Sequence, residues 1–262
     1  MTRMFYEMFQ IHCPVSECHL GFFLRCLKAF GKFFRCLCHA HSFSSTAKCC
    51  FYNDRIPDFR SVDGLYNQQW KYPPETILSH SFFERYPEEY YRFHRAKLVI
   101  DGVKPNRAHL RLAELEREGK LRAVITQNID GLHQAAGSKN VLELHGSILR
   151  AYCSRCRMPY PADKMNHGEG VPRCKCGGVI RPDIVLYEEQ LDEDVLAKSV
   201  HYLRNADVLI VGGTSLNVYP AAGLINYYRG NKLVLVNLSE TPYDSCADLI
   251  IHEKIGEVFS RI

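Results

Sequence analysis

Residues 208–215 read Val-Leu-Ile-Val-Gly-Gly-Thr-Ser, and this stretch decides the expected fold. Four consecutive apolar residues predict a short strand buried on both faces, as the strands of a parallel sheet are. The glycines and hydroxyl residues that follow predict a turn at its carboxyl end. Residues 123–126 (Ala-Val-Ile-Thr, then Gln-Asn) and 233–236 (Leu-Val-Leu-Val, then Asn-Leu) repeat the pattern. Doubly wound sheets bind ligands outside the carboxyl ends of their strands, so these turns predict a nucleotide-binding crevice.

Strand and helix patterns alternate from residue 51 onward, which predicts an α/β fold with a Rossmann-like, doubly wound parallel sheet. Residues 67–118 are expected to form a mainly helical insertion. Its clearest helix runs from Asn106 to Glu118, where leucines and an alanine punctuate charged residues. The aromatic residues between Phe82 and Phe93 are expected to pack in a core rather than to line a cofactor site.

The composition is that of an ordinary globular protein. The 262 residues are 46% hydrophobic and 24% charged, which excludes disordered, collagenous and coiled-coil classes. The longest apolar runs fall well short of the roughly 18 residues of a membrane span. The length predicts one or two domains. We divide the chain into an atypical segment, residues 1–54, and a main domain, residues 55–262, that contains the helical insertion and a small module at about 151–180.

The first 50 residues differ from the rest in composition. They hold six Lys and Arg against two acidic residues, a net of +4 that equals the formal charge of the whole chain. The remaining residues are therefore balanced in charge, and we expect no nucleic-acid binding by the main domain. Seven of the 12 cysteines and eight of the 14 phenylalanines also lie in these 50 residues.

Residues 21–38 predict a basic amphipathic helix, because four Lys and Arg recur at helical spacing among Phe and Leu. Such a helix could lie on an anionic membrane surface, although membrane association is not the expectation we favour. Charges interrupt each apolar stretch and no small-residue cleavage site follows, so a secretory signal is disfavoured and we expect a cytoplasmic protein. The cysteines of this segment lack zinc-site spacing, and their odd number argues against a disulfide framework.

Four other cysteines form two close pairs, Cys153-x-x-Cys156 and Cys174-x-Cys176, with seventeen residues between them. This spacing predicts a tetrahedral structural zinc site, and the Gly-Gly that follows permits a tight turn around the metal. The alternative is four buried or incidental cysteines. A zinc ribbon alone could also indicate nucleic-acid or protein binding.

Four local sequences carry a more specific pattern: Ile-Pro-Asp-Phe-Arg-Ser at 56–61, Thr-Gln-Asn-Ile-Asp-Gly-Leu-His at 126–133, Leu-His-Gly-Ser at 144–147, and Gly-Gly-Thr-Ser-Leu at 212–216. Together with the cysteine pairs, they resemble the sirtuin family of NAD-dependent protein deacylases, in its bacterial type, from Ile56 to about Ile262. The resemblance implies a protein lysine deacetylase that acts on acetyl-lysine proteins or peptides. NAD⁺ would be a co-substrate, yielding nicotinamide, O-acetyl-ADP-ribose and deacylated lysine, and Zn²⁺ would be structural.

The resemblance also implies roles for individual residues. His145 would be the general base that takes a proton from a ribose hydroxyl, a task that suits a side chain with a pKa near neutrality. Its alternative is a satisfied, partly buried histidine. Asn128 and Asp130 would orient the ribose and bind the nicotinamide carboxamide, and their alternative is turn formation. The other implied cofactor contacts are Phe59, Arg60, Gln127, Ile129, Gly213, Thr214, Ser215, Asn237 and Ile255. Residues 185–189 would pair as a strand with the substrate peptide, or form an ordinary edge strand.

The chain departs from the family at its beginning. Sirtuins carry a Gly-Ala-Gly loop after the first strand, where backbone N–H groups meet the pyrophosphate, but residues 45–55 contain no glycine. No convincing apolar strand precedes them, so we expect the first strand and the phosphate loop to be missing. We expect residues 1–54 to be a misread segment, from a frameshift or a misplaced start. The alternative is a natural variant with a basic helix in place of the loop. Besides deacetylation, a zinc-containing module that binds acyl-lysine or NAD without turnover and an ADP-ribosyltransferase remain open.

Overall fold

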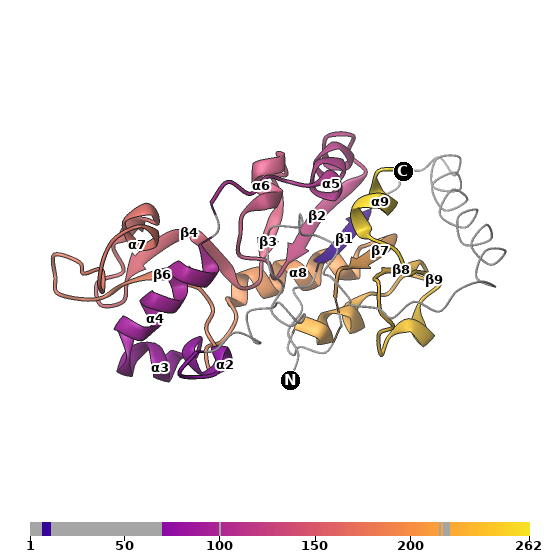
Figure 1. The fold of residues 1–262 in the computed structure, drawn as a ribbon. Helices are drawn as coiled ribbons and strands as arrows, with labels where there is room; N and C mark the ends of the chain where they lie inside the picture. The colour runs from indigo at the N-terminus through magenta and orange to yellow at the C-terminus, as the bar shows by residue number, and fades with distance from the viewer. Residues whose placement is uncertain (1–6, 12–69, 100, 215, 217–220) are drawn as a thin grey trace, which may run out of the picture.

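The computed structural model describes residues 7–11, 70–99, 101–214, 216 and 221–262, which form two sheets with helices around them (Figure 1). The larger sheet has the strand order β3-β2-β1-β7-β8-β9, and the smaller one has the order β5-β4-β6. The strands are β1 (Glu7–Ile11), β2 (Leu121–Thr126), β3 (Val141–Glu143), β4 (Gly146–Cys153), β5 (Pro159–Pro161), β6 (Ile180–Ile184), β7 (Val208–Gly212), β8 (Leu233–Val236) and β9 (Leu249–Ile251). The helices are α2 (Pro74–Ile77), α3 (His80–Arg85), α4 (Pro87–Phe93), η2 (His94–Leu98), α5 (Arg107–Arg117), α6 (Leu132–Ala136), α7 (Asp163–Asn166), α8 (Glu193–Arg204), η3 (Ala221–Tyr227), η4 (Asp244–Cys246) and α9 (Ile255–Phe259).

The three strands predicted from apolar runs are confirmed as β2, β7 and β8. β2 pairs in parallel with β3, and β7, β8 and β9 are parallel to one another. Both groups run antiparallel to β1, so these five strands share one direction. The expected Rossmann-like parallel sheet is therefore present in all strands of the larger sheet except its central one.

The central strand β1 is not the parallel first strand that the sequence predicts to be missing, and the residues just before the stretch at 45–55 lie outside the described residues. β1 lies between β2 and β7 and is antiparallel to both. Its first residue, Glu7, lies in register with Thr126 and Gly212, the last residues of the neighbouring strands. Its last residue, Ile11, lies in register with Val208 at the opposite edge. A strand thus lies between β2 and β7, but its amino end lies at the edge where a parallel strand would place its carboxyl end.

Helices cover both faces of the larger sheet. Val208 and Ile210 pack with α5 and α9, whereas Leu209 and Val211 pack with α8 and η3. This alternation follows from the period of two along a strand, which sends successive side chains to opposite faces. The buried runs seen in the sequence therefore reflect a sheet covered on both sides.

The predicted helix at 106–118 is confirmed as α5. Asn106 precedes it as the N-cap, and its Oδ1 accepts hydrogen bonds from the backbone N of Ala108 at 2.9 Å and of His109 at 3.2 Å. These bonds satisfy donors that have no partner within the first turn of a helix. The helix ends at Arg117, one residue before the predicted boundary.

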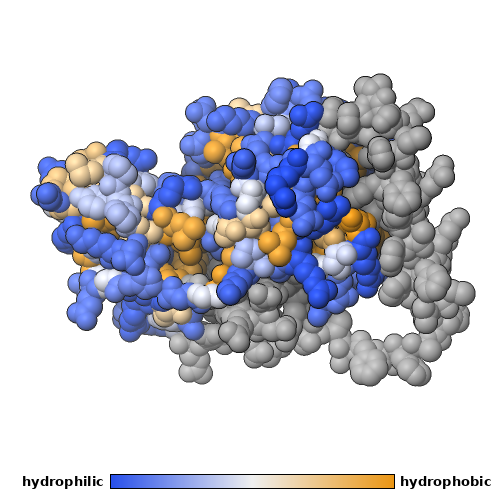
Figure 2. All heavy atoms as spheres, turned by 90° about the horizontal axis from the view of Figure 1, so that it is seen from above, coloured by the Kyte–Doolittle hydropathy of each residue, from blue (hydrophilic) through white to orange (hydrophobic). Residues whose placement is uncertain are grey.

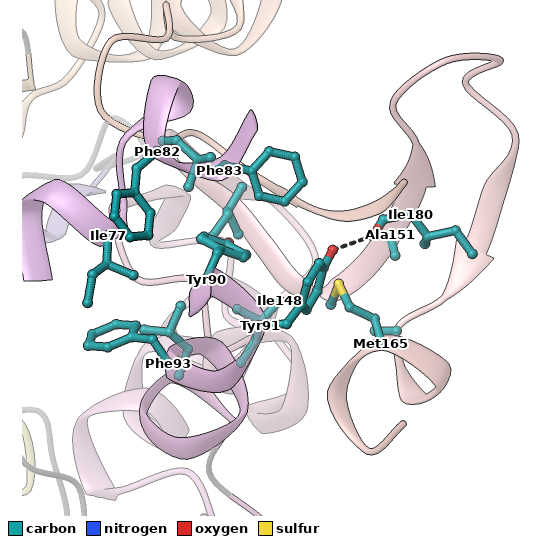
Figure 3. Packing of buried hydrophobic residues seen from close by; sticks show 14 of the residues in the cluster. Ile77, Phe82, Phe83, Tyr90, Tyr91, Phe93, Ile148, Ala151, Met165 and Ile180 are labelled. Carbon is teal, nitrogen blue, oxygen red and sulfur yellow. Dashed lines mark hydrogen bonds between the residues drawn. The ribbon is translucent and has the colours of Figure 1, made fainter. Parts of the chain in front are cut away.

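A second lobe combines α2, α3, α4 and η2, the first part of the expected helical insertion, with the smaller sheet, whereas α5, the rest of that insertion, packs against the larger sheet. Tyr90, Tyr91 and Phe93 of α4 have no exposed surface and pack with residues of β4, β6 and α7 (Figure 3). The Tyr91 hydroxyl donates a hydrogen bond to the backbone oxygen of Ile180, at the start of β6. The prediction that these aromatic residues form a core is confirmed, and the first part of the helical insertion shares this core with residues of the small module.

In the space-filling view, hydrophobic residues gather where the smaller lobe meets the larger one (Figure 2). In the part of the chain that the structure describes, no helix combines the length and the apolar character needed to cross a membrane. The predicted basic helix at 21–38 and the glycine-free stretch at 45–55 lie outside the described residues.

Candidate functional site

The turn after β2 forms the first wall of the candidate site. Thr126, Gln127 and Asn128 are polar, yet they are only 2%, 1% and 4% exposed. The Thr126 hydroxyl accepts a hydrogen bond from the backbone N of Asn128 at 3.0 Å, which turns the chain directly after the strand. Gln127 Nε2 is buried and has no hydrogen-bond partner among the described residues. A buried donor without a partner is costly, so this amide is suited to bind a ligand.

Asp130 combines a structural bond with an unused oxygen. Its Oδ1 accepts a hydrogen bond from the backbone N of Leu132 at 2.9 Å and so begins α6. Its Oδ2 is buried without a hydrogen-bond partner in the described part of the chain. Burial raises the pKa of this carboxyl above its ordinary value. One oxygen therefore forms the turn, and a ligand contact of the other oxygen stays a prediction.

His145 lies between β3 and β4, and backbone bonds hold the residues around it against the turn after β2. The backbone N of Leu144 donates to the Thr126 oxygen at 2.9 Å, and the backbone N of Ile148 donates to the Ile129 oxygen at 3.0 Å. The Ser147 hydroxyl lies 3.4 Å from that same Ile129 oxygen. The two motifs at 126–133 and 144–147 are thus joined on both sides of His145.

The turn at Gly146 requires glycine. Its φ of +72° lies in the left-handed region, and a Cβ at this position would lie 2.0 Å from the backbone oxygen of Asp183 in β6. On its other side, the His145 oxygen accepts a hydrogen bond from the backbone N of Val185 at 3.0 Å. The histidine backbone is therefore fixed between the turn after β2 and the segment after β6.

The ends of β7 and β8 form the second wall. The backbone N of Gly213 donates to the Val236 oxygen at 3.1 Å, and the Thr214 hydroxyl accepts from the backbone N of Leu216 at 2.9 Å. Asn237 is 5% exposed, and its Nδ2 donates to the Ser239 oxygen at 2.8 Å. These residues follow the carboxyl ends of parallel strands, at the same edge as Thr126, which is where ligands of such sheets bind.

The remaining predicted contacts fall into two groups. Ile255, the first residue of α9, is completely buried in the core, and its Cδ1 occupies the space next to Gly212, 2.2 Å from where a Cβ would stand there. This packing explains why an apolar side chain stands at position 255, and the contact of Ile255 with a cofactor stays a prediction. Phe59, Arg60 and Ser215 lie outside the described residues.

The described residues fit the nicotinamide end of a dinucleotide. The buried, unused Gln127 amide donor and Asp130 carboxyl oxygen match a carboxamide, which both donates and accepts hydrogen bonds. Toward the pyrophosphate, the fit among the described residues rests on the turn at Gly213 and Thr214, because β1 runs in the reverse direction between the two walls.

The segment at 185–189 contains no strand. Tyr187 forms a single bridge with Ser79, and the predicted edge strand is absent from these residues. The structure adds a feature that the sequence analysis missed: Arg181 in β6 forms an ion pair with Glu189, the last residue of this segment. A charged residue inside an otherwise buried strand, eight positions before a glutamate, is the signal that could have indicated it.

The four predicted zinc ligands lie together in the smaller lobe. The sulfur atoms of Cys153, Cys156, Cys174 and Cys176 all lie within 4.8 Å of one another, with 3.5 Å from Cys153 to Cys176 and 3.6 Å from Cys156 to Cys174. Zinc bound at about 2.3 Å to four sulfurs would set them about 3.8 Å apart, whereas a disulfide is about 2.0 Å long. The donor set and its spacing therefore fit a closed, structural zinc site.

Groups around the cluster favour the thiolate form of Cys174, whereas the pKa of Cys156 is raised, because hydrogen bonds with the neighbouring thiols outweigh the backbone N–H of Met158. The Tyr160 hydroxyl donates to Cys174 Sγ at 3.1 Å and lowers the pKa of that thiol to about 6. The backbone N of Cys176 also points to Cys174 Sγ, at 3.5 Å. A Cβ at Gly178 would lie 2.7 Å from Cys153 Sγ, so the Gly-Gly turn allows the close approach that the sequence predicted.

Comparisons with known proteins agree with this site. A family model described as the Sir2 family matches residues 53–220. A curated NAD-dependent protein deacetylase of Clostridium perfringens is 57% identical over 211 residues, covering 79% of this chain and 86% of the relative. One from Clostridium acetobutylicum is 54% identical with the same coverage. Among solved structures, Sir2 with a p53 peptide and NAD⁺ is 44% identical with a TM-score of 0.69, and the match covers 79% of this chain and 85% of that one. Sir2 bound to an acetylated peptide has 43% identity and a TM-score of 0.69, with coverages of 74% and 84%.

Proposed function

The chain belongs to the Sir2 family, and on that basis we propose that it is an NAD-dependent protein lysine deacetylase. Its substrates are acetyl-lysine proteins or peptides, and its products are nicotinamide, O-acetyl-ADP-ribose and the deacylated lysine. We further propose that residues 55–262 form the catalytic domain. The cytoplasmic location stays a prediction, which cell fractionation tests.

One observation carries the proposal: the two chemistry-bearing motifs form a single hydrogen-bonded unit with unused polar atoms inside it. Leu144 and Ile148 bond to the turn after β2 on either side of His145. Gln127 Nε2 and Asp130 Oδ2 are buried there with no hydrogen-bond partner in the described ranges. Native proteins rarely leave such atoms unsatisfied, and ligand groups that accept from the amide and pair with the carboxyl oxygen would satisfy them.

We propose His145 as the general base of the reaction. Bound NAD⁺ supplies the ADP-ribosyl group that releases nicotinamide and accepts the acyl group. The imidazole of His145 takes a proton from a ribose hydroxyl, because a histidine accepts and returns protons near neutral pH. The backbone bonds at Gly146 and Val185 fix the position from which the ring acts.

Asn128 and Asp130 hold the nicotinamide and ribose in this proposal. The raised pKa of Asp130 favours its protonated form more than in water, and in that form the carboxyl can both donate and accept. Gln127 and Ile129 complete the contacts at this end. Gly213, Thr214, Ser215, Asn237 and Ile255 serve the rest of the dinucleotide, together with Phe59 and Arg60.

The four cysteines hold zinc as a structural ion. With four thiolate ligands the metal has no open position, so it supplies no activated water to the reaction. Its role is to stabilise the lobe that carries β4 and β6, between which the Gly146 turn is held.

The test is a product assay with an acetyl-lysine peptide and NAD⁺, followed by mass spectrometry. A deacetylase yields nicotinamide, O-acetyl-ADP-ribose and deacetylated peptide in equal amounts. Transfer of ADP-ribose to the peptide or to a protein acceptor would instead indicate an ADP-ribosyltransferase. Binding of the peptide without any product would contradict the enzymatic proposal and support a binding module.

A further inference from the structure

Arg181 and Glu189 form an ion pair that the proposed mechanism does not use. The Arg181 side chain is 7% exposed, and its NH1 and NH2 groups donate to Glu189 Oε1 at 2.5 Å and Oε2 at 2.8 Å. Two parallel bonds between a guanidinium and a carboxylate fix the relative orientation of both groups, which a single contact does not. Burial alone would raise the pKa of Glu189, but the guanidinium and the donors around it lower that pKa to about 2.

The same two side chains also bond to the backbone of the segment between them. Arg181 NH2 donates to the Ile184 oxygen at 2.9 Å, and the backbone N of Leu186 donates to Glu189 Oε2 at 2.8 Å. His80 Nδ1 of α3 lies 2.8 Å from Glu189 Oε1. The pair therefore fixes the beginning and the end of the turn that residues 185–189 form.

This turn joins the proposed catalytic histidine to the helical insertion. Its first residue, Val185, donates its backbone N–H to the His145 oxygen. Tyr187 donates to the Leu78 oxygen and accepts from the backbone N of His80, both at 3.0 Å. A shift of the turn would therefore be transmitted to His145 on one side and to α3 on the other.

A buried ion pair is weak support for stability, because desolvation of the two charges offsets much of their attraction. The Arg181 guanidinium lies 5.4 Å from the centre of the Phe83 ring and 5.7 Å from that of Tyr152, in surroundings that apolar side chains could fill. Its retention is better explained by the geometry that it imposes on the turn.

We propose that Arg181 and Glu189 are positioning residues that preset the turn at 185–189 for the acyl-lysine peptide. Neither touches the substrate; they hold the backbone that the peptide lies against. This inference rests on the proposed function, since it takes the substrate to be a peptide. A preset turn lowers the ordering cost of binding, so its loss weakens peptide binding and leaves NAD⁺ binding intact.

The variant Glu189→Gln tests the positioning role of this ion pair, because an amide places a donor against the donors of Arg181 and Leu186. Hydrogen exchange of the folded, ligand-free protein should show faster exchange at residues 185–189. The KM for an acetyl-lysine peptide should rise by about tenfold or more, while the KM for NAD⁺ changes by less than about twofold. Glu89→Gln, which breaks the exposed ion pair of Glu89 with Arg92 in α4, is the matched control and should change none of these values.

The paired variant Arg181→Met with Glu189→Met covers the case in which the single variant fails to fold. Replacing both charges by apolar groups of similar volume is often tolerated by a protein core. This double variant should melt near the parent temperature and still show the faster exchange and the weaker peptide binding.

Two results would contradict the positioning role of Arg181 and Glu189. The first is unchanged exchange at 185–189, and the second is faster exchange with unchanged peptide affinity measured by calorimetry. Failure of the parent protein to turn over acetyl-lysine peptide would contradict the proposed function alone. Exchange and calorimetric binding need no turnover, so they still decide the proposal in that case.

Discussion

The two ends of the candidate site are built to different degrees. At the nicotinamide end, backbone hydrogen bonds join the turn after β2 to the segment around His145. Gln127 Nε2 and Asp130 Oδ2 are buried there without a hydrogen-bond partner among the described residues. At the pyrophosphate end, the centre of the sheet is filled by β1, whose direction is opposite to that of its neighbours. The sequence explains this contrast, since the motifs of the first end are intact and no glycine-rich loop occurs at 45–55.

The contrast separates two demands on a central strand. The hydrogen-bonding groups of β2 and β7 can be satisfied by a strand of either direction. Only a parallel strand, however, brings its carboxyl end and a turn of backbone N–H donors to the ligand edge. β1 satisfies the hydrogen-bonding groups of β2 and β7. Among the described residues, the turn at Gly213 and Thr214 is then left to supply backbone N–H donors at the ligand edge.

Zinc removal should have the largest effect on stability, and the effect should be confined to the smaller lobe and the nicotinamide end of the site. Apparent binding free energies of structural zinc are about 10–16 kcal/mol in small zinc domains, so a strong chelator should unfold the lobe that carries β4, β5 and β6. Hydrogen exchange should increase there and around His145, and change little in α5, β7 and β8. Folded protein with less than one zinc per chain by metal analysis would contradict the assignment of the four cysteines.

The zinc cysteines show what local sequence can predict. Their paired spacing, the apolar runs of β2, β7 and β8, and the helical pattern from Asn106 to Glu118 are all local patterns, and the structure confirms each. β1 was missed because its pairing depends on which strands leave a gap, not on its own residues 7–11. The Arg181–Glu189 pair was missed because a charged residue in a strand indicates a partner without identifying it, and the turn that brings Glu189 to Arg181 has no local pattern of its own.

Substitution of the proposed base should have the next largest effect. His145→Ala should lower turnover by about 10²–10⁴-fold, the usual contribution of a positioned general base. Calorimetric binding of NAD⁺ and of the acetyl-lysine peptide should change much less. His201→Ala, a histidine on α8, is the control and should retain the parental rate. Equal rates for the His145 variant and the parent would remove His145 from the mechanism.

Restoring the pyrophosphate end should raise activity. We expect a chimera in which a parallel strand and a Gly-Ala-Gly loop replace residues 1–54 to turn over faster by about 10²-fold, because a cofactor misplaced by about 1 Å loses about that factor. The measurement is the NAD-dependent deacetylation rate of both proteins at the same peptide concentration. Equal rates would show that residues 1–54 supply the missing contacts and that the expectation of a misread segment is wrong.

The smallest effect should come from Glu7, and it tests the direction of β1 itself. The reversed strand sets Glu7 in register with Thr126 and Gly212, at the edge where a pyrophosphate needs donors. Two like charges about 4 Å apart repel by about 1 kcal/mol in water and more near a protein surface. Glu7→Gln should therefore lower the KM for NAD⁺ by about 3- to 10-fold and leave the KM for the peptide unchanged.

The origin of that change can be checked in the same assay. A gain caused by reduced repulsion should shrink as ionic strength rises, because salt screens exposed charges. Glu118→Gln removes the same charge at the opposite edge, just before β2, and should leave the KM for NAD⁺ as it is. If both variants or neither changed that KM, Glu7 would not stand at the ligand edge. The central strand would then have to run parallel to its neighbours, and the contrast between the two ends of the site would disappear.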